Sequence, residues 1–178
     1  MIYLISDTHF NHKNILAYEN RPFNSVSDMN NQLIKRWNEI VAPDDTVYHL
    51  GDFALGSAHD LDWLINSLNG HKILIRGNHD HSSRNRYLNA GFEGVMPFLV
   101  LQYNGRSILL THTPDGHPEI QHDLHFYGHV HSKGMDLFPT IARNGACLCV
   151  ERWNYEPVPL DEVIRLCDMA AFVAPAVV

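Results

Sequence analysis

The sequence has few basic residues and no long hydrophobic run, and each shortage excludes a class of protein. Its 13 lysines and arginines stand against 20 aspartates and glutamates, so we expect no basic stripe that would grip a nucleic-acid backbone. The apolar stretch over residues 169–178 is too short to span a bilayer. No basic segment followed by an apolar stretch and a cleavage site opens the chain, so we expect a cytoplasmic protein without a signal peptide or a membrane partner.

Cysteines are also scarce, and their spacing excludes two kinds of structural cross-link. The chain has only Cys147, Cys149 and Cys167, with no C-x-x-C pair. This argues against a disulfide framework and against a zinc knuckle, so we expect buried, reduced thiols. The length of 178 residues, with 45% hydrophobic and 19% charged residues, fits one soluble domain over residues 1–178.

Short apolar runs rich in β-branched and aromatic residues predict strands at 2–6, 46–50, 73–75, 95–103, 107–110, 126–127, 140–142 and 147–153. Asn104-Gly105 predicts a hairpin turn. Helices are expected from Ser25 to about residue 40, at 59–68, near 83–89 and after Pro159. Strands and helices alternate early and strands dominate later. We therefore expect an α/β fold, a four-layer α-β-β-α sandwich with two mixed β-sheets flanked by helices.

Five short stretches, each at or just past the end of an expected strand, carry side chains that bind metals. They are Asp7-Thr8-His9, Gly51-Asp52, Gly77-Asn78-His79-Asp80, Thr111-His112 and Gly128-His129-Val130-His131. In an open α/β sheet, functional residues gather outside the carboxyl ends of the strands, so these stretches can meet at one edge. The glycine before three of the candidate ligands allows a sharp turn or a close approach. The pattern predicts a metal site.

The candidate ligands are too many for one ion. They are Asp7, His9, Asp52, Asn78, His112, His129 and His131. Two divalent ions that share a carboxylate would use them well. The mixture of imidazole, carboxylate and amide groups suits Mn, Fe, Zn or Ni better than Ca, and we expect manganese first, with Fe, Zn or Ni as alternatives.

The five stretches together, in this order, resemble the motifs of the calcineurin-like metallophosphoesterase superfamily. The match runs from Asp7 to His131. Arg21-Pro22-Phe23 and Trp153-Asn154-Tyr155-Glu156-Pro157 also resemble a small branch of that superfamily found in microbes and their phages.

The resemblance implies a role for each matched residue. Asp7, His9 and His131 would hold one metal, Asn78, His112 and His129 the other, and Asp52 would bridge them. A hydroxide between the two ions would attack the phosphorus. His79 would be a catalytic non-ligand that contacts the phosphate and protonates the leaving group. The implied activity is hydrolysis of phosphodiesters or small, nucleotide-type phosphate esters, with such an ester as the partner.

Departures from better-known relatives narrow the class. Protein Ser/Thr phosphatases extend the second motif to Gly-Asp-x-x-Asp-Arg-Gly, whereas this chain reads Gly51-Asp52-Phe53-Ala54-Leu55-Gly56. Purple acid phosphatases have a tyrosine ligand where Leu55 stands. The small bacterial-type phosphodiesterases are closer. The alternatives are a nuclease, a dinucleoside polyphosphate hydrolase, or a non-catalytic protein-interaction scaffold with this fold.

Three further residues are candidates for binding the substrate phosphate: His12, Arg21 and Arg84. Each also has a plainer interpretation, as a solvated loop histidine or as an arginine in an ion pair. Asp80 is a candidate for orienting His79, but neighbours in sequence seldom face each other, and we expect Asp80 to cap the following helix. The remaining histidines, His117 among them, are treated as background.

Overall fold

The computed structural model describes residues 1–115 and 119–173, and its strands form two five-stranded mixed sheets. In the first sheet, β1 (Ile2–Ile5), β2 (Thr46–His49), β3 (His71–Ile75) and β4 (Gly94–Met96) are parallel, and β10 (Val158–Pro159) pairs antiparallel with β1. In the second, β6 (Arg106–Leu110), β7 (Leu124–Tyr127) and β9 (Gly145–Cys147) are parallel, with β5 (Leu99–Tyr103) and β8 (Ile141–Ala142) antiparallel at the edges. The expected α/β class with two mixed sheets is confirmed.

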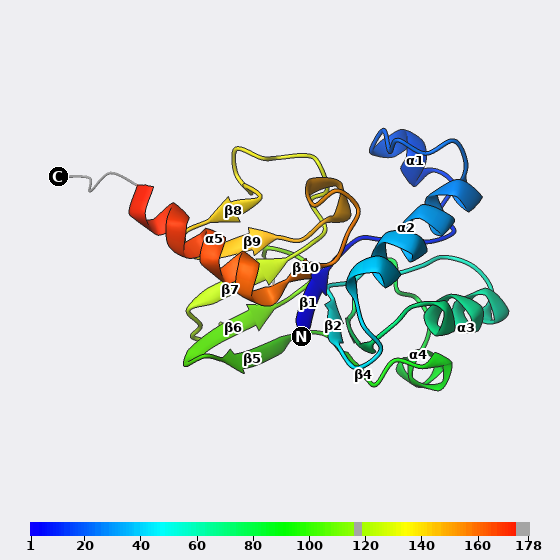
Figure 1. The fold of residues 1–178 in the computed structure, drawn as a ribbon, viewed down its shortest axis with the longest axis horizontal. Helices are drawn as coiled ribbons and strands as arrows, with labels where there is room; N and C mark the ends of the chain where they lie inside the picture. Colours follow the sequence, from blue (N-terminus) through cyan, green and yellow to red (C-terminus); the bar gives the residue numbers. More distant parts are fainter. Residues whose placement is uncertain (116–118, 174–178) are drawn as a thin grey trace.

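Three helices cover the outer face of the first sheet: α2 (Val26–Ile40), α3 (Ala58–Ser67) and α4 (Arg84–Ala90) (Figure 1). Successive strand residues point to opposite faces, and Tyr3 and Ile5 of β1 pack with Leu33 and Trp37 of α2 in one buried cluster. Helix α2 begins as expected at Ser25, which accepts a hydrogen bond from the Asp28 backbone N–H. The short helix α1 (Ile15–Tyr18) was not expected.

The other face of the first sheet packs on the second sheet. Leu4 and Ile75 belong to the same buried cluster as Leu110 and Phe126. Helix α5 (Leu160–Val173) adds Val163 and other residues to this cluster and contacts β1, β8, β9 and β10. Over the far face of the second sheet, the loop after β7 places Val130 and Phe138 on Tyr127, Cys147 and Cys149. All three cysteines are buried and free, as expected.

Two expected strands are divided in the structure. The run over 95–103 forms β4 and β5, one in each sheet, with Pro97 between them. The run over 147–153 ends as a strand at Cys147 and continues as a 3-10 helix, η1 (Val150–Arg152). The hairpin at Asn104-Gly105 is confirmed by the antiparallel pairing of β5 and β6, with both turn residues at positive φ. None of the helices in the described ranges is long and apolar enough to cross a membrane.

The carboxyl ends of β1, β2, β3, β6 and β7 meet at one edge shared by both sheets. The Asp7 backbone N–H donates to the Gly51 carbonyl at 3.0 Å, which joins the segments after β1 and β2. The Gly128 N–H donates to the His112 carbonyl at 2.8 Å, which joins those after β7 and β6. The His129 N–H donates to the Asp7 carboxylate at 2.9 Å, so the two sheets are linked at the expected site.

Candidate metal centre

The seven candidate ligands gather at this edge in two groups. Ligand atoms of Asp7, His9 and His131 lie within 4.8 Å of one another, and so do those of Asp52, His112 and His129. The seventh candidate, Asn78, belongs with the second group, since its Oδ1 lies 2.9 Å from His112 Nε2. The structure therefore brings all seven together from five strand ends.

Asp52 lies between the two groups. Its Oδ2 is 3.5 Å from His9 Nε2 and 3.4 Å from His112 Nε2. Its Oδ1 accepts a hydrogen bond from the His79 backbone N–H at 2.8 Å. One carboxylate oxygen thus faces both groups while the other is held by the backbone.

The hydrogen bonds of the candidate ligand atoms indicate whether metal ions fit this site. Asp7 Oδ2 accepts from the Ser6 hydroxyl and the His129 N–H, at 2.5 and 2.9 Å. By contrast, Asp7 Oδ1 and His9 Nε2 are buried and have no hydrogen-bond partner among the described residues. Buried polar atoms without a partner are costly, and a cation between them would satisfy both. The donor set of carboxylate, imidazole and carboxamide fits a borderline divalent ion.

The backbone at these ligands is held in an unusual conformation. Asp7, His9, Asp52, His129 and His131 all have positive φ, between 48° and 70°. Residues other than glycine rarely adopt this left-handed backbone conformation, and those that do cluster at functional sites. The glycines before the ligands are needed for close approach, since a Cβ at Gly77 would collide with Asp52 and one at Gly128 with Ser6 and Asp7.

Burial and neighbouring carboxylates shift the pKa values of two imidazoles, His9 and His112, in opposite directions. Burial lowers the pKa of His9 to about 2, so this ring is neutral at pH 7 and its nitrogen is free to bind a cation. For His112, burial is outweighed by the Asp52 carboxylate, which raises the pKa to about 9. In the absence of a metal, a proton on His112 therefore compensates the carboxylate charge.

Metal binding should raise thermal stability because the metal-free site holds buried polar atoms without partners. An ion at about 100 times its dissociation constant stabilises a folded protein by about 2.7 kcal/mol, which for this length corresponds to a rise in Tm of roughly 5–10 °C. We expect this rise when Mn²⁺ is added to chelator-treated protein in calorimetry. An unchanged Tm in Mn²⁺ at saturating concentration would contradict a site of this kind.

The catalytic candidate, His79, lies beside the ligands. Its ring centroid is 5.4 Å from that of His9, and its imidazole makes no hydrogen bond within the described residues. His12 forms a triangle with these two rings, since its ring lies 5.4 Å from that of His9 and 6.2 Å from that of His79. The structure thus places His12 next to the site, where a substrate phosphate could reach it.

The two arginines lie elsewhere. Arg21 is buried, and its guanidinium donates to the carbonyls of Asp7 and Thr8 and pairs with Glu151. Its guanidinium is therefore occupied inside the protein, and the expectation that Arg21 binds the substrate phosphate is not supported. Arg84 is exposed and donates to the Val95 carbonyl at 3.1 Å, without a described contact to any candidate ligand.

Sequence reasoning misjudged Asp80 and missed Glu151. The cap of α4 is Ser83, whereas the buried Asp80 carboxylate accepts from the backbone N–H groups of Gly77, Asp52 and Phe53 at 2.8–3.0 Å. Asp80 thus fixes the backbone at Asp52. Glu151 accepts from His131 Nδ1 at 3.0 Å. The background residue His117 lies outside the described residues.

Residues 1–150 match the family model of the calcineurin-like phosphoesterase superfamily domain. The chain belongs to the calcineurin-like phosphoesterase superfamily. Membership indicates, in general terms, a metal-dependent phosphoesterase. The candidate metal groups found in this calcineurin-like phosphoesterase agree with that description.

Two similar proteins match nearly the whole chain, and a third matches part of it. An uncharacterised protein of Methanocaldococcus jannaschii is 41% identical over 172 residues, which cover 94% of this chain and 91% of the relative. The gene 66 protein of Mycobacterium phage L5 is 40% identical over 79 residues, or 42% of this chain and 37% of the phage protein. The crystal structure of a protein of unknown function from Aquifex aeolicus is similar with a TM-score of 0.72 and 28% identity, covering 93% of this chain and 98% of the other.

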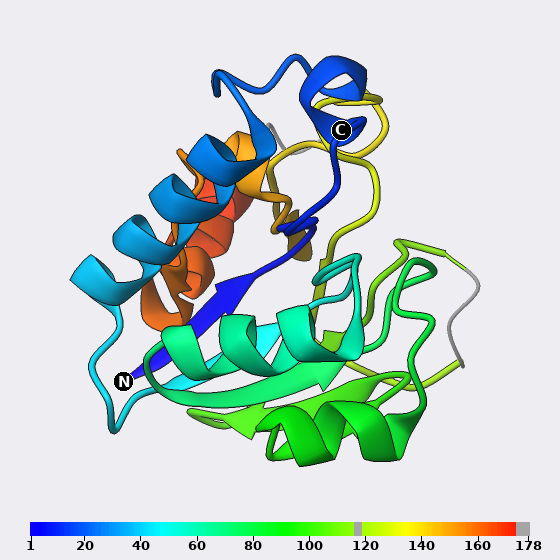
Figure 2. The ribbon, with the colours of Figure 1, turned by 90° about the vertical axis from the view of Figure 1, so that its right-hand side faces the viewer.

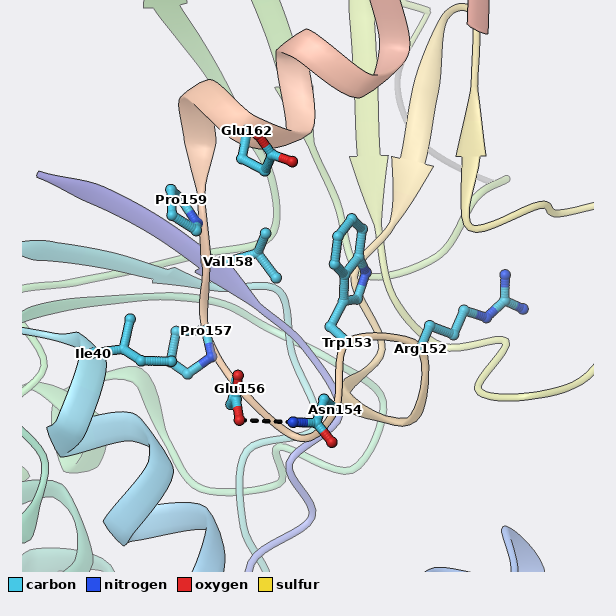
Figure 3. Close-up of a pocket in the computed structure, with 9 residues that line it drawn as sticks. All are labelled: Ile40, Arg152, Trp153, Asn154, Glu156, Pro157, Val158, Pro159 and Glu162. Carbon is cyan, nitrogen blue, oxygen red and sulfur yellow. Dashed lines mark hydrogen bonds between the residues drawn. The ribbon is translucent and has the colours of Figure 1, made fainter. Parts of the chain in front are cut away.

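A pocket of about 550 Å³ lies away from the ligands, between Ile40, the turn over residues 152–157 and the start of α5 (Figure 3). None of the seven candidate ligands lines it. The pocket is therefore separate from the candidate metal centre of this phosphoesterase.

Proposed function

We propose that this protein is a dinuclear metal-dependent phosphoesterase that hydrolyses phosphodiesters or small, nucleotide-type phosphate esters. The observation that carries the proposal is the position of Asp52 Oδ2 between two complete ligand groups, 3.5 Å from His9 and 3.4 Å from His112. Asp7, His9 and His131 would hold one ion, Asn78, His112 and His129 the other, and Asp52 both. Two such ions, with Mn²⁺ expected first, would supply Lewis-acid activation of water and of the phosphate oxygens.

The chain's own residues bind and orient the ester. Two buried carboxylates, Asp7 and Asp52, neutralise only half of the charge of two divalent ions. With both ions bound, the site would therefore be positive inside an acidic protein and would attract an anionic phosphate. His12 and His79 face the same edge, where imidazole N–H groups can donate to phosphate oxygens. His79 can then donate a proton to the leaving-group oxygen.

The intact ligand set argues against a scaffold that has lost its catalytic residues, because neither a candidate ligand nor His79 is missing. The direct test uses metal-stripped protein, bis(p-nitrophenyl) phosphate and p-nitrophenyl phosphate, with Mn²⁺, Ni²⁺, Zn²⁺ or Mg²⁺ added back. We expect turnover with Mn²⁺ above all. No turnover with any of the four metals would contradict the proposal. Comparing single-stranded oligonucleotides with dinucleoside polyphosphates would then separate a nuclease from a hydrolase of small nucleotides.

A groove beside the candidate ligands favours a diester substrate whose second ester group is aromatic or apolar. It has a volume of about 340 Å³, with His129 and His131 in its wall and Val130 and Phe138 as apolar lining. Its other wall includes Glu19, which follows α1 and binds Ser132 and Lys133 of the loop after β7. The backbone of this loop passes beside α1 (Figure 2). We propose that the ester group that is not displaced lies in this groove, against the Phe138 ring.

Replacing Phe138 with alanine should lower kcat/KM for bis(p-nitrophenyl) phosphate about tenfold. Loss of an aromatic contact costs about 0.5–1.5 kcal/mol beyond area burial, and about 1.4 kcal/mol is tenfold in rate. Methyl p-nitrophenyl phosphate has the same leaving group without a second ring, so its kcat/KM should change little. Leu137→Ala is the matched control, since this neighbour is 80% exposed and does not line the groove. Equal losses on both substrates would show that Phe138 acts only through the fold.

A further inference from the structure

Two stretches outside the metal motifs, residues 21–23 and 150–157, contact each other next to the candidate ligands Asp7, His9 and His131. The Phe23 and Tyr155 rings lie edge to face, 4.9 Å apart. The Arg21 guanidinium lies over the Tyr155 ring at 5.8 Å and donates to Glu151 Oε1 from Nε and Nη2, at 3.0 and 2.6 Å. The Arg21 side chain is completely buried and Glu151 is 4% exposed. An ion pair so shielded from water constrains the geometry of whatever it bonds to.

Arg21 also holds the segment after β1. Its Nη2 donates to the Asp7 carbonyl at 2.6 Å and its Nη1 to the Thr8 carbonyl at 2.7 Å. These carbonyls belong to the backbone that presents Asp7 and His9 at positive φ. Since a left-handed conformation persists only where the surroundings enforce it, the guanidinium is a physical reason for this turn.

Glu151 holds the third ligand of the same group. Its Oε1 accepts from His131 Nδ1 at 3.0 Å, so Nδ1 carries a proton and Nε2 is the ring nitrogen that remains for a metal. His131 Nε2 lies 3.5 Å from Asp7 Oδ1, within the ligand group. A further carboxylate near His131, that of Glu19, is engaged by Ser132 at 2.6 Å and Lys133 at 3.0 Å. Glu151 is therefore the acid that orients His131.

From these contacts we propose that Arg21 and Glu151 are positioning residues for one metal site only, the site of Asp7, His9 and His131. The inference rests on the two metal sites of the proposed function. One buried ion pair holds the segment that carries two ligands of this group, through the carbonyls of Asp7 and of Thr8, which precedes His9, and it holds the third ligand, His131, through its imidazole. None of the described hydrogen bonds of Arg21 or Glu151 reaches Asn78, His112 or His129. We therefore predict that loss of Arg21 or Glu151 weakens metal binding at this site and not at the other.

The test is Mn²⁺ binding to the full chain, followed by calorimetric titration and by elemental analysis after dialysis. In Glu151→Leu we expect one of two ions to bind about 10- to 100-fold more weakly, the usual cost of removing a residue that orients a ligand. The other ion should bind as in the unaltered protein. Electron paramagnetic resonance should then show an isolated Mn²⁺ ion where the unaltered protein shows a spin-coupled pair.

Two further variants keep the test decisive if Glu151→Leu folds poorly. Glu151→Gln retains an oxygen for His131 and Arg21, so its weak site should be affected less than in Glu151→Leu. Arg36→Met is the matched control: Arg36 also lies against the Tyr155 ring, at 6.0 Å, but bonds to the Asn154 carbonyl and not to the ligand segments. It should bind both ions normally.

Several results would overturn the inference: two ions bound at unchanged affinity in Glu151→Leu, equal weakening of both ions, or an identical effect in Arg36→Met. Failure of the proposed function would look different. An unaltered protein that binds two ions but hydrolyses no ester would remove the activity and leave the positioning role testable. An unaltered protein that binds a single ion would remove the pair of sites on which the inference depends.

Discussion

Asp52→Asn should reduce Mn²⁺ binding from two ions to one or none and lower kcat/KM by about 1000-fold. Asp52 Oδ2 is the oxygen that faces both ligand groups, at 3.5 Å from His9 and 3.4 Å from His112. Asparagine preserves the size and one oxygen, but it removes the negative charge that would offset two cations. A metal site that loses a charged ligand loses affinity as well as the activation of water that the ions supply. Elemental analysis after dialysis measures the first effect and steady-state kinetics the second.

The control for this experiment must alter a carboxylate without touching the site. Asp44→Asn serves, because Asp44 is exposed in the turn before β2. It should bind two ions and retain full activity. If Asp52→Asn also kept two ions at unchanged affinity, Asp52 would not join the two sites.

Much of the candidate metal centre could be predicted from the sequence because the position of each ligand depends on a short local pattern. Each ligand stands within a few residues of a strand end, and parallel strands bring their carboxyl ends to one edge whatever the details of packing. Asp7, Asp52 and His129 could therefore be placed together from their positions at strand ends alone. The paired sheets and most helices follow in the same way from periodicity and from caps such as Ser25.

The supporting residues could not be predicted, because their roles depend on contacts across the whole chain. Glu151 lies 20 residues from His131 and 130 from Arg21, and no local pattern joins them. A loop arginine such as Arg21 resembles a substrate clamp until its burial is known. Asp80 was misread because its place before α4 suggests a cap, whereas its side chain turns inward to the backbone of Asp52. The only indication was the resemblance of residues 21–23 and 153–157 to one branch of the superfamily.

His79→Ala should differ from Asp52→Asn in metal binding, since it should keep both ions although it also loses activity. The His79 backbone N–H holds Asp52 Oδ1 at 2.8 Å, and alanine retains that bond. What disappears is an imidazole that is available to the substrate and lies 5.4 Å from the His9 ring. Removal of a general acid typically costs about 100- to 10,000-fold in rate, so we expect a loss of this size for esters with an alkyl leaving group.

The leaving group makes this prediction specific to proton donation. Because p-nitrophenolate departs readily without a proton, bis(p-nitrophenyl) phosphate should lose much less activity in His79→Ala than an alkyl ester such as a dinucleotide. The control is His81→Ala, since His81 is an exposed imidazole whose ring lies 6.1 Å from that of His79. Equal losses on both esters would assign His79 to phosphate binding, and full activity on both would remove it from the mechanism. A general acid acts on the leaving oxygen alone, so only the difference between the two esters identifies it.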